Sequence, residues 1–405
     1  MPPKPLKHVH TVHEVHPVHI VHLSASAASL PFAGIRSSRL RISQTRVYFT
    51  RAHLPLMILP LVVLLSLLVV GGYALLRYLN FHPAPIMEEP VLNDPGVPTL
   101  DADQPIRVLT YNVQYFAGTD YSFFYDGGPD TVVTTDDVHS TIGRIAKFIG
   151  DTDADFVFLQ EVDQGAKRSG HTDQIALLQA QLKGRYPSCV SSYYWFSKFV
   201  PHPKVWGPVG MKLVILSKYR LGKAYRHKLA STPGKPINRD FNIKRAFLEV
   251  AVPSSEEPDL VLINTHLEAF TEGTNVLELQ VNQIRQYLNQ LDARSVPWIL
   301  GGDFNALPPG QYERLAPADR ARHTDHAELK ELYSNHQGVP TVADATDPSS
   351  PCFFTFTVRD GDTRRAVRTL DYLFVSSKLR ISDYHIEHRA LLTQSDHLPL
   401  IAEIA

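Results

Sequence analysis

The residues of this chain that could do chemistry lie in six short polar motifs, each at the end of an apolar, strand-like run. The motifs are LTYNVQYF (109–116), LQEVD (159–163), INTHLEA (263–269), LGGDFNA (300–306), LDYLFVS (370–376) and SDHLPL (395–400). Their carboxylates, amides and imidazoles are Asn112, Glu161, His266, Asp303, Asn305, Asp371, Asp396 and His397. Oxygen ligands in this number suit Mg²⁺, which proteins hold with a few carboxylates and substrate phosphate oxygens. Imidazoles for proton transfer complete the set that metal-assisted hydrolysis of a phosphoester requires.

Taken in order, these motifs resemble the endonuclease/exonuclease/phosphatase superfamily, which includes pancreatic deoxyribonuclease, abasic-site endonucleases, inositol-polyphosphate phosphatases and neutral sphingomyelinases. The resemblance extends over residues 104–405, the length of one large α/β domain. A single motif such as SDHLPL would be weak, whereas six in the family's order, each after a strand, are specific. The resemblance implies a four-layer α/β sandwich, in which two packed β-sheets are flanked by helices, and a metal-dependent phosphoric ester hydrolase.

The resemblance also assigns three residues to a metal ion. Glu161 corresponds to the primary metal ligand, Asn112 would offer a carbonyl oxygen beside it, and Asp396 resembles a further carboxylate on the metal side. A carboxylate at a buried strand end, such as Glu161, is destabilising unless a cation or a donor compensates it. The implied cofactor is Mg²⁺, with Mn²⁺ as the alternative, and the number of ions stays open.

The other five residues are assigned to catalysis. His397 resembles the general base that takes a proton from the attacking water, and Asp371 the carboxylate that fixes its tautomer. Asp303 and Asn305 would orient the nucleophile and the phosphoryl oxygen, and His266 would donate to a non-bridging oxygen. The alternatives are an Asx turn for Asp303 and Asn305, and a surface carboxylate at the start of a strand for Asp371.

Hydropathy periodicity predicts the elements that would position these residues. Strands are predicted over 106–113, 155–160, 192–196, 211–217, 244–252, 259–265, 298–300, 370–376 and 398–404, and helices over 136–149, 173–183 and 275–291. Thr134 and Thr135 are candidate caps of the first helix, and the fifth and sixth strands would be an antiparallel pair that delivers His266. Gly301-Gly302 would let the backbone come close to a ligand before Asp303. Helices and strands interleaved in this way favour two packed sheets flanked by helices.

Residues 54–76 contain no charged side chain over 23 positions. As a helix rising ~1.5 Å per residue, this run would be about 34 Å long, enough for a bilayer core of about 30 Å. A buried core helix is the alternative, but a soluble helix of this length normally has a polar face. Tyr73, Arg77 and Tyr78 lie where the anchors of a membrane interface are expected. The expected organisation is a disordered leader (1–53), a transmembrane helix (54–78), a Pro-rich linker (79–104) and a catalytic domain (105–405).

Charge asymmetry predicts the orientation of this helix. The leader holds seven Lys/Arg and one acid, Glu14, whereas residues 77–103 hold Arg77 against five acids. The positive-inside rule therefore places the N-terminus in the cytosol and the catalytic domain on the extracytosolic side of a single-pass protein. The long N-terminal region and the lack of an Ala-x-Ala site argue against a cleaved signal peptide. An organelle membrane reached by a transit peptide is the alternative, because residues 24–53 are rich in Ser and Arg and free of acids.

Two compositional features carry no catalytic prediction. A Val-His-x triplet recurs through His8, His10, His13, His16, His19 and His22. The tract has no helix or strand period that would gather its imidazoles, so low complexity explains it better than metal binding. Cys189 and Cys352 are interpreted as small buried apolar residues, since a domain of this size does not depend on a disulfide.

The remaining observations concern the substrate. Residues 1–77 contain eight of the 40 Lys/Arg and one of the 41 Asp/Glu, which leaves a net charge of −8 for residues 78–405. An acidic domain is poorly suited to nucleic acid, although a nucleic-acid substrate stays an alternative. The aromatic-dense residues 193–206 either dip into lipid or pack as a core strand. Lys244 and Arg245 either contact a substrate phosphate or are solvated where a strand begins.

The sequence thus predicts a membrane-anchored, Mg²⁺-dependent phosphodiesterase acting on a phospholipid headgroup or another phosphorylated surface molecule. The LTYNVQ motif (109–114) leans toward the neutral sphingomyelinases within the resemblance. A nuclease, a phosphomonoesterase and a catalytically silent binding module are the alternatives. The presence of every polar site residue argues against the silent module, because an inactive site is free to lose them.

Overall fold

The computed structural model describes residues 54–405 except 234–239, 256, 270, 272, 321–322, 324–326, 348, 350, 361–362 and 389–392. The predicted leader and its histidine tract lie outside the described residues. The chain divides into two units, Met1–Val63 and Leu64–Ala405. Apart from the first turns of one helix, all features below belong to the second unit.

The uncharged run forms one long helix, α1 (Leu54–Leu79), with Pro60 inside it. Within the described part of the chain, its segment Ile58–Leu79 is the one helix long and apolar enough to cross a membrane, with a mean hydropathy of 2.5. Its apolar side chains are exposed, Leu67 by 63% and Val69 by 72%. Because a helix that is apolar on all sides is stable only in apolar surroundings, α1 is a candidate membrane span, as the sequence predicts.

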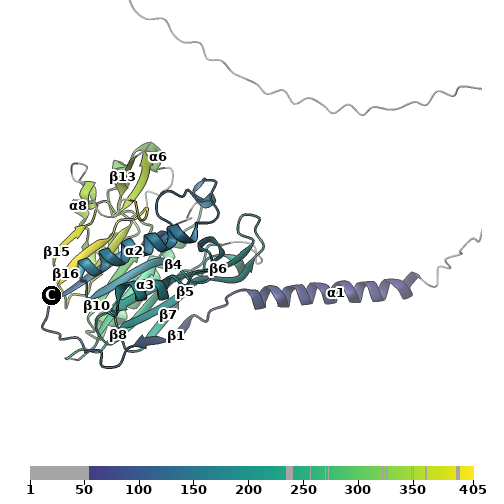
Figure 1. Ribbon diagram of the computed structural model, residues 1–405, viewed down its shortest axis with the longest axis horizontal. Coiled ribbons are helices and arrows are strands. Elements are labelled where there is room, and N and C mark those ends of the chain that lie inside the picture. The colour runs from purple at the N-terminus through teal and green to yellow at the C-terminus, as the bar shows by residue number, and fades with distance from the viewer. Residues whose placement is uncertain are drawn as a thin grey trace, which may run out of the picture. The chain divides into compact units, whose positions relative to one another are not determined.

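Two seven-stranded, mixed β-sheets form the body of the second unit (Figure 1). In order across the first sheet the strands are β1 (Ile86–Glu89), β7 (Ala224–Lys228), β8 (Ala246–Val252), β9 (Leu260–His266), β10 (Trp298–Asp303), β14 (Asp371–Val375) and β11 (Gln337–Val339). Across the second they are β15 (Ile381–Ile386), β16 (Leu400–Ile404), β3 (Ile106–Asn112), β4 (Phe156–Asp163), β6 (Gly207–Ser217), β5 (Ser188–Val200) and β2 (Val91–Asn93). Each sheet has one parallel pair, β9–β10 in the first and β3–β4 in the second.

Helices cover both outer faces of this pair of sheets. The α-helices after α1 are α2 (Thr135–Thr152), α3 (Gln174–Leu182), α5 (Val276–Ala293), α6 (Pro317–Arg320), α7 (Lys330–Asn335) and α8 (Val342–Thr346), and β12 (Phe356–Asp360) and β13 (Thr363–Arg368) form a separate hairpin. Phe158 and Leu248 belong to the apolar core between the sheets. The apolar sides of α2 and α3 pack on the second sheet, and those of α5 and α7 on the first. The predicted four-layer α/β sandwich is confirmed.

The start of α2 shows how local sequence fixes an element in this fold. Thr134 is extended, and its side chain accepts a hydrogen bond from the backbone N–H of Asp137, as the sequence predicts for a cap. Asp136 and Asp137 lie in the first turn, where the helix dipole favours negative charge. Ile142 and Ile145 are buried on the face toward the second sheet.

The predicted linker is wrong for residues 86–93, because they are part of the sandwich. β1 pairs with β7 and β2 pairs with β5, so this segment adds one edge strand to each sheet. Strands of four and three residues are too short to show an alternating pattern. The surrounding prolines disguise them further, although proline is compatible with edge strands.

Two predictions about strand ends are also corrected. β4 does not end before Glu161 but continues to Asp163, past an irregularity in its pairing with β6 where Glu161 has a φ of 59°. Gly301 and Gly302 lie inside β10, and a Cβ on Gly302 would be 2.0 Å from the Thr265 carbonyl oxygen. Close packing between neighbouring strands, not the approach of a ligand, accounts for this glycine.

Candidate active site

Four predicted site residues lie at the carboxyl ends of the two parallel strand pairs. Asn112 ends β3 and Glu161 lies near the end of β4, while His266 ends β9 and Asp303 ends β10. β10 contacts both β3 and β4 across the sandwich, so the ends of the two pairs meet at one edge. The carboxyl ends of parallel strands are where α/β sheets commonly bind ligands.

Asp303 is the centre of this cluster. Its Oδ2 accepts a hydrogen bond of 3.0 Å from Asn112 Nδ2, and lies 3.4 Å from His266 Nε2 and 3.5 Å from His397 Nε2. The side chain is buried, and burial raises the pKa of Asp303 to about 6. The Asp303 carboxylate therefore contacts residues of three other motifs.

His397 and Asp371 form the predicted dyad. His397 Nδ1 lies 2.8 Å from Asp371 Oδ2, and both residues are buried. Burial opposes protonation of the ring, but Asp371 and then Asp303 outweigh it and raise the pKa of His397 to about 10. The edge of the ring packs against Phe356, with ring centroids 5.0 Å apart. Asp371 is thus no surface carboxylate, and in this arrangement it holds the imidazole as a cation at neutral pH.

His266, unlike His397, is neutral. Its Nδ1 lies 3.1 Å from the Tyr194 hydroxyl, while its Nε2 faces Asp303. Burial, and then the positive charge of Arg245, lower the pKa of His266 well below its usual value. A neutral ring that accepts from Tyr194 at Nδ1 carries its proton on Nε2, where it can donate.

Glu161 lies beside this cluster on the predicted metal side. Its Oε1 accepts a 3.2 Å hydrogen bond from Asn112 Nδ2. Burial, and then the negative charge of Asp396, raise the pKa of Glu161 to about 7. The side-chain oxygen of Asn112, Oδ1, accepts a 3.0 Å hydrogen bond from the Gln114 backbone N–H. Because this oxygen already has a partner, its role as a metal ligand stays a prediction. Two carboxylates that destabilise each other in this way fit a divalent cation.

A second group in the described chain has its ligand atoms within 4.8 Å of one another, namely Asp303, Asp371 and His397. Metal binding requires a neutral imidazole, and Asp371 instead favours the protonated ring. Glu161 Oε1 lies 3.9 Å from His266 Nε2, and the lowered pKa of His266 keeps that ring from competing as a cation. The chemistry of the donors therefore favours Glu161 and Asp396 as the residues that would hold a divalent ion.

Asn305 follows Asp303 in a tight turn. Its backbone φ is 49°, and its N–H donates to Asp303 Oδ1 at 2.9 Å. Its side-chain nitrogen donates to the Leu267 carbonyl oxygen at 3.0 Å. The Asx turn offered by the sequence is present, and it fixes the Asp303 carboxylate. The contact of Asn305 with a phosphoryl oxygen stays a prediction.

Arg245 lies beside the site, where the sequence left its role open. It is 2% exposed, and its Nη2 lies 3.6 Å from Glu268 Oε1. Its Nε and Nη1 are buried and make no hydrogen bond to any described residue. The solvated alternative is therefore wrong for Arg245, whose unused donors suit an anion. Lys244 is buried too, and its ammonium donates to the carbonyl oxygens of Asp240 and Asn242.

The sequence did not predict three residues that support the site, Arg168, Asp163 and Tyr115. Arg168 binds Asp163 through two hydrogen bonds of 2.9 Å and lies 3.6 Å from the centre of the Tyr115 ring. This contact joins the segment after Glu161 to the segment after Asn112. No linear signal marks it, because the partners come together only once the sheet is formed.

The cysteines and the aromatic segment are also placed. Cys189 is buried and Cys352 is exposed, so the burial prediction holds for Cys189 and is wrong for Cys352, and neither is paired. Residues up to Val200 of the aromatic segment belong to β5, with Tyr194 buried, while Trp206 is exposed. The core-strand interpretation therefore holds as far as Val200, and lipid contact by the remaining residues stays a prediction.

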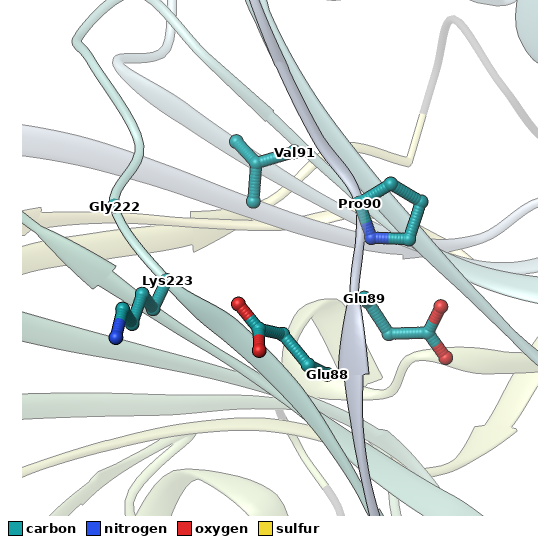
Figure 2. Close-up of a pocket in the computed structure, with 6 residues that line it drawn as sticks. All are labelled: Glu88, Glu89, Pro90, Val91, Gly222 and Lys223. Atoms are coloured by element: carbon teal, nitrogen blue, oxygen red, sulfur yellow. The ribbon is translucent and has the colours of Figure 1, made fainter.

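A cavity of about 470 Å³ lies away from the catalytic residues. It forms at the edge strands, and its lining is Glu88, Glu89, Pro90, Val91, Gly222 and Lys223 (Figure 2). The side chains of Glu88 and Glu89 point to opposite sides of β1, as successive residues of a strand do. The cavity contains none of the motif residues, so we assign the site from the chemistry at the strand ends.

Comparison with known proteins finds similarity to one family. The model of the Endonuclease/Exonuclease/phosphatase family matches residues 109–397, a range that includes all eight predicted site residues. An endonuclease/exonuclease/phosphatase from Beutenbergia cavernae is 22% identical with a TM-score of 0.51, covering 74% of this chain and 71% of that chain. The human Nocturnin catalytic domain with bound sulfate is 18% identical with a TM-score of 0.48, covering 78% of this chain and 96% of that one. No curated protein matches the chain in sequence.

Proposed function

This chain belongs to the endonuclease/exonuclease/phosphatase family, and from that premise we propose a membrane-anchored, Mg²⁺-dependent phosphodiesterase that acts on a phospholipid or another phosphorylated molecule at a membrane surface. The coarser statement, a metal-dependent hydrolase of phosphoric esters, follows from the family itself. The observation that carries the finer proposal is the buried Asp303 cluster in a chain that also has a candidate membrane span.

We assign the roles from the charge state of each group. Glu161 and Asp396, with Asn112, would hold the cation, which when bound would neutralise negative charge on the phosphoryl group. His397 takes the proton of the attacking water in its neutral form, and Asp371 orients the ring. A cation beside Asp396 would favour that neutral form, because like charges oppose one another.

The opposite side of the cluster is suited to donating hydrogen bonds. His266 presents Nε2 next to Asp303, and Arg245 has two unused buried donors. As negative charge develops on a phosphoryl oxygen, fixed donors in a buried site stabilise it strongly. Asp303 and Asn305 complete the arrangement by positioning the nucleophile and the phosphoryl oxygen.

The substrate class rests on charge and on the membrane segment. The net charge of −8 for residues 78–405 disfavours nucleic acid. A span in the same chain confines the site to a bilayer surface, where phosphorylated headgroups are concentrated. We propose that the N-terminus is cytosolic and the catalytic domain extracytosolic, from the basic leader.

Substrate turnover tests this function directly. The purified full chain would be given a choline-phosphate lipid, a phosphoinositide and single-stranded DNA, each with and without Mg²⁺, and His397→Ala would be the inactive control. We expect Mg²⁺-dependent cleavage of a lipid phosphodiester and little cleavage of DNA. Faster cleavage of DNA would establish the nuclease alternative, release of inorganic phosphate alone the phosphomonoesterase, and no turnover the silent binding module.

A further inference from the structure

We propose that the end of the β5–β6 hairpin, residues 198–206, is a membrane-docking surface that rests on phospholipid headgroups where α1 leaves the bilayer. The inference rests on the proposed membrane anchoring and adds a surface to it. It assigns the bilayer itself, not a second protein, as the partner of this hairpin.

The chain that leaves α1 is attached to this hairpin. Asn80, 8% exposed, forms a β-bridge with Ser197, and the Ser197 hydroxyl lies 3.2 Å from the Leu79 carbonyl oxygen, to which it donates. Phe81 meets Phe196 edge to face, with centroids 6.4 Å apart. All five residues belong to the unit Leu64–Ala405. The C-terminal end of α1 is therefore fixed beside β5, and a bilayer spanned by α1 would begin next to the hairpin.

The side chains around this junction are those found at a membrane interface. Trp206 and Tyr78 are exposed by 60% and 69%, and Arg77, Lys198 and Lys204 are exposed as well. The Lys198 ammonium lies 3.7 Å from the centre of the Tyr78 ring. Aromatic rings with basic residues beside them are typical of headgroup contact.

The sequence around the hairpin is basic, whereas the domain as a whole is acidic. Residues 174–239 contain twelve Lys/Arg and no Asp or Glu, in a domain whose net charge is −8. This range includes β5, β6 and β7, and therefore the whole hairpin (Figure 1). A basic surface next to a membrane segment is attracted to anionic lipid by roughly 1 kcal/mol per Lys or Arg near the surface, about fivefold in binding.

The hairpin is also connected to the catalytic site. The Lys167 ammonium donates to the carbonyl oxygens of Val205 and Trp206, at 3.3 and 3.1 Å. The His202 ring stacks on Phe124 with centroids 5.6 Å apart. Lys167 lies shortly after Glu161 in the chain, and Phe124 lies in the loop after Asn112. Docking of the hairpin would thus bring the segments that follow Glu161 and Asn112 close to the headgroups.

Tryptophan quenching tests the docking. The chain has three tryptophans, of which Trp298 is fully buried and Trp195 partly buried. The full chain would be reconstituted in anionic vesicles that contain brominated phospholipid. We expect quenching in the wild type that Trp206→Phe removes. Equal quenching in the two proteins would overturn the proposal.

Charge reversal provides the second test. In anionic vesicles, Lys198→Glu with Lys204→Glu should lower lipid turnover by at least about 25-fold, and should leave hydrolysis of a soluble phosphodiester unchanged. Lys378→Glu, an exposed lysine after β14, is the matched control. Unchanged lipid turnover would overturn the inference, and loss of DNA binding without loss of vesicle docking would assign the surface to nucleic acid. If the wild type cleaved no lipid, the proposed function would fail while the quenching result still decided the docking.

Discussion

One buried carboxylate in this site lies between two imidazoles, one cationic and one neutral. Asp303 Oδ2 is 3.4 Å from His266 and 3.5 Å from His397. Asp371 favours the cationic form of His397, whereas burial and Arg245 keep His266 neutral. Carboxylates therefore decide the charge of His397, whereas burial decides that of His266, which suits one ring to proton transfer and the other to hydrogen-bond donation.

Asp371→Asn should shift the pH dependence of the rate. Because Asp371 raises the pKa of His397 to about 10, its loss leaves burial dominant and lowers that pKa. A base acts when unprotonated, so kcat/KM of the wild type should rise with pH toward the His397 pKa of about 10, and the rise should occur at lower pH in Asp371→Asn.

His397→Ala should lower the rate by roughly 10²–10⁴-fold. Asp383→Asn, exposed on β15, is the control, and an unshifted profile would contradict the dyad.

Glu161→Gln should weaken metal binding more than chemistry. The change removes one of two carboxylates whose mutual repulsion a cation would relieve. Activity should require Mg²⁺ or Mn²⁺, disappear with EDTA, and in Glu161→Gln recover partly as Mg²⁺ is raised. Titration of activity with Mg²⁺ measures this, with the exposed Glu313→Gln as control. Full activity in chelator would contradict the metal assignment.

The gathering of these side chains was largely predictable because their motifs end strands, where chain direction alone brings polar residues together. Asn112, Glu161, His266 and Asp303 are examples. Tyr194 was not predictable as a partner of His266, because it lies inside β5 and contacts a ring on the other sheet. Such contacts depend on how the two sheets pack, which no local pattern records.

Among the elements, the parallel pair β9–β10 sets the position of the central carboxylate. Gly302 pairs with Thr265, and Asp303 pairs with His266 one residue on. Because a Cβ on Gly302 would be 2.0 Å from the Thr265 carbonyl oxygen, Gly302→Ala should push the strands apart. We expect lower thermal stability and a large loss of activity. Gly143→Ala in α2, where no atom lies within 4 Å of the added Cβ, should instead stabilise by up to about 1 kcal/mol.

The edge strands give a second prediction at this scale. A chain that begins at Asn80 keeps β1 and β2, whereas one that begins at Gln104 loses both and exposes the backbone edges of β7 and β5. The shorter chain should melt at a lower temperature and aggregate more readily. Equal melting temperatures would show that these strands contribute nothing to stability.

The predicted helices and strands correspond to observed elements, although β5 extends well beyond the predicted 192–196, and the shortest strands were missed. The predicted helix over 136–149 and the antiparallel strands before His266 correspond to α2, β8 and β9, because each spans several periods of its pattern. β1, β2 and β11 have only three or four residues, and their pairing is set by distant partners. The end of β4 was misplaced because Glu161 adopts a positive φ inside the strand.

For the whole molecule, the proposed membrane helix and docking hairpin would make the orientation of the chain decisive for its substrate. Along the sequence, the basic leader precedes α1 and the acidic catalytic domain follows it. In the proposed single-span topology the catalytic domain would have access to one leaflet alone, and the positive-inside rule predicts the extracytosolic leaflet.

Protease protection in sealed vesicles with the cytosolic side outward tests this orientation. We expect added protease to remove the leader and leave residues 105–405 intact until detergent opens the vesicles. Digestion of residues 105–405 with the leader protected would reverse the orientation, and joint protection would contradict a single span with the leader in the cytosol. A leader cleaved off inside an organelle would support the transit-peptide alternative. In each case the protected side identifies the leaflet whose lipids the docked hairpin contacts, and hence the headgroups within reach of His397.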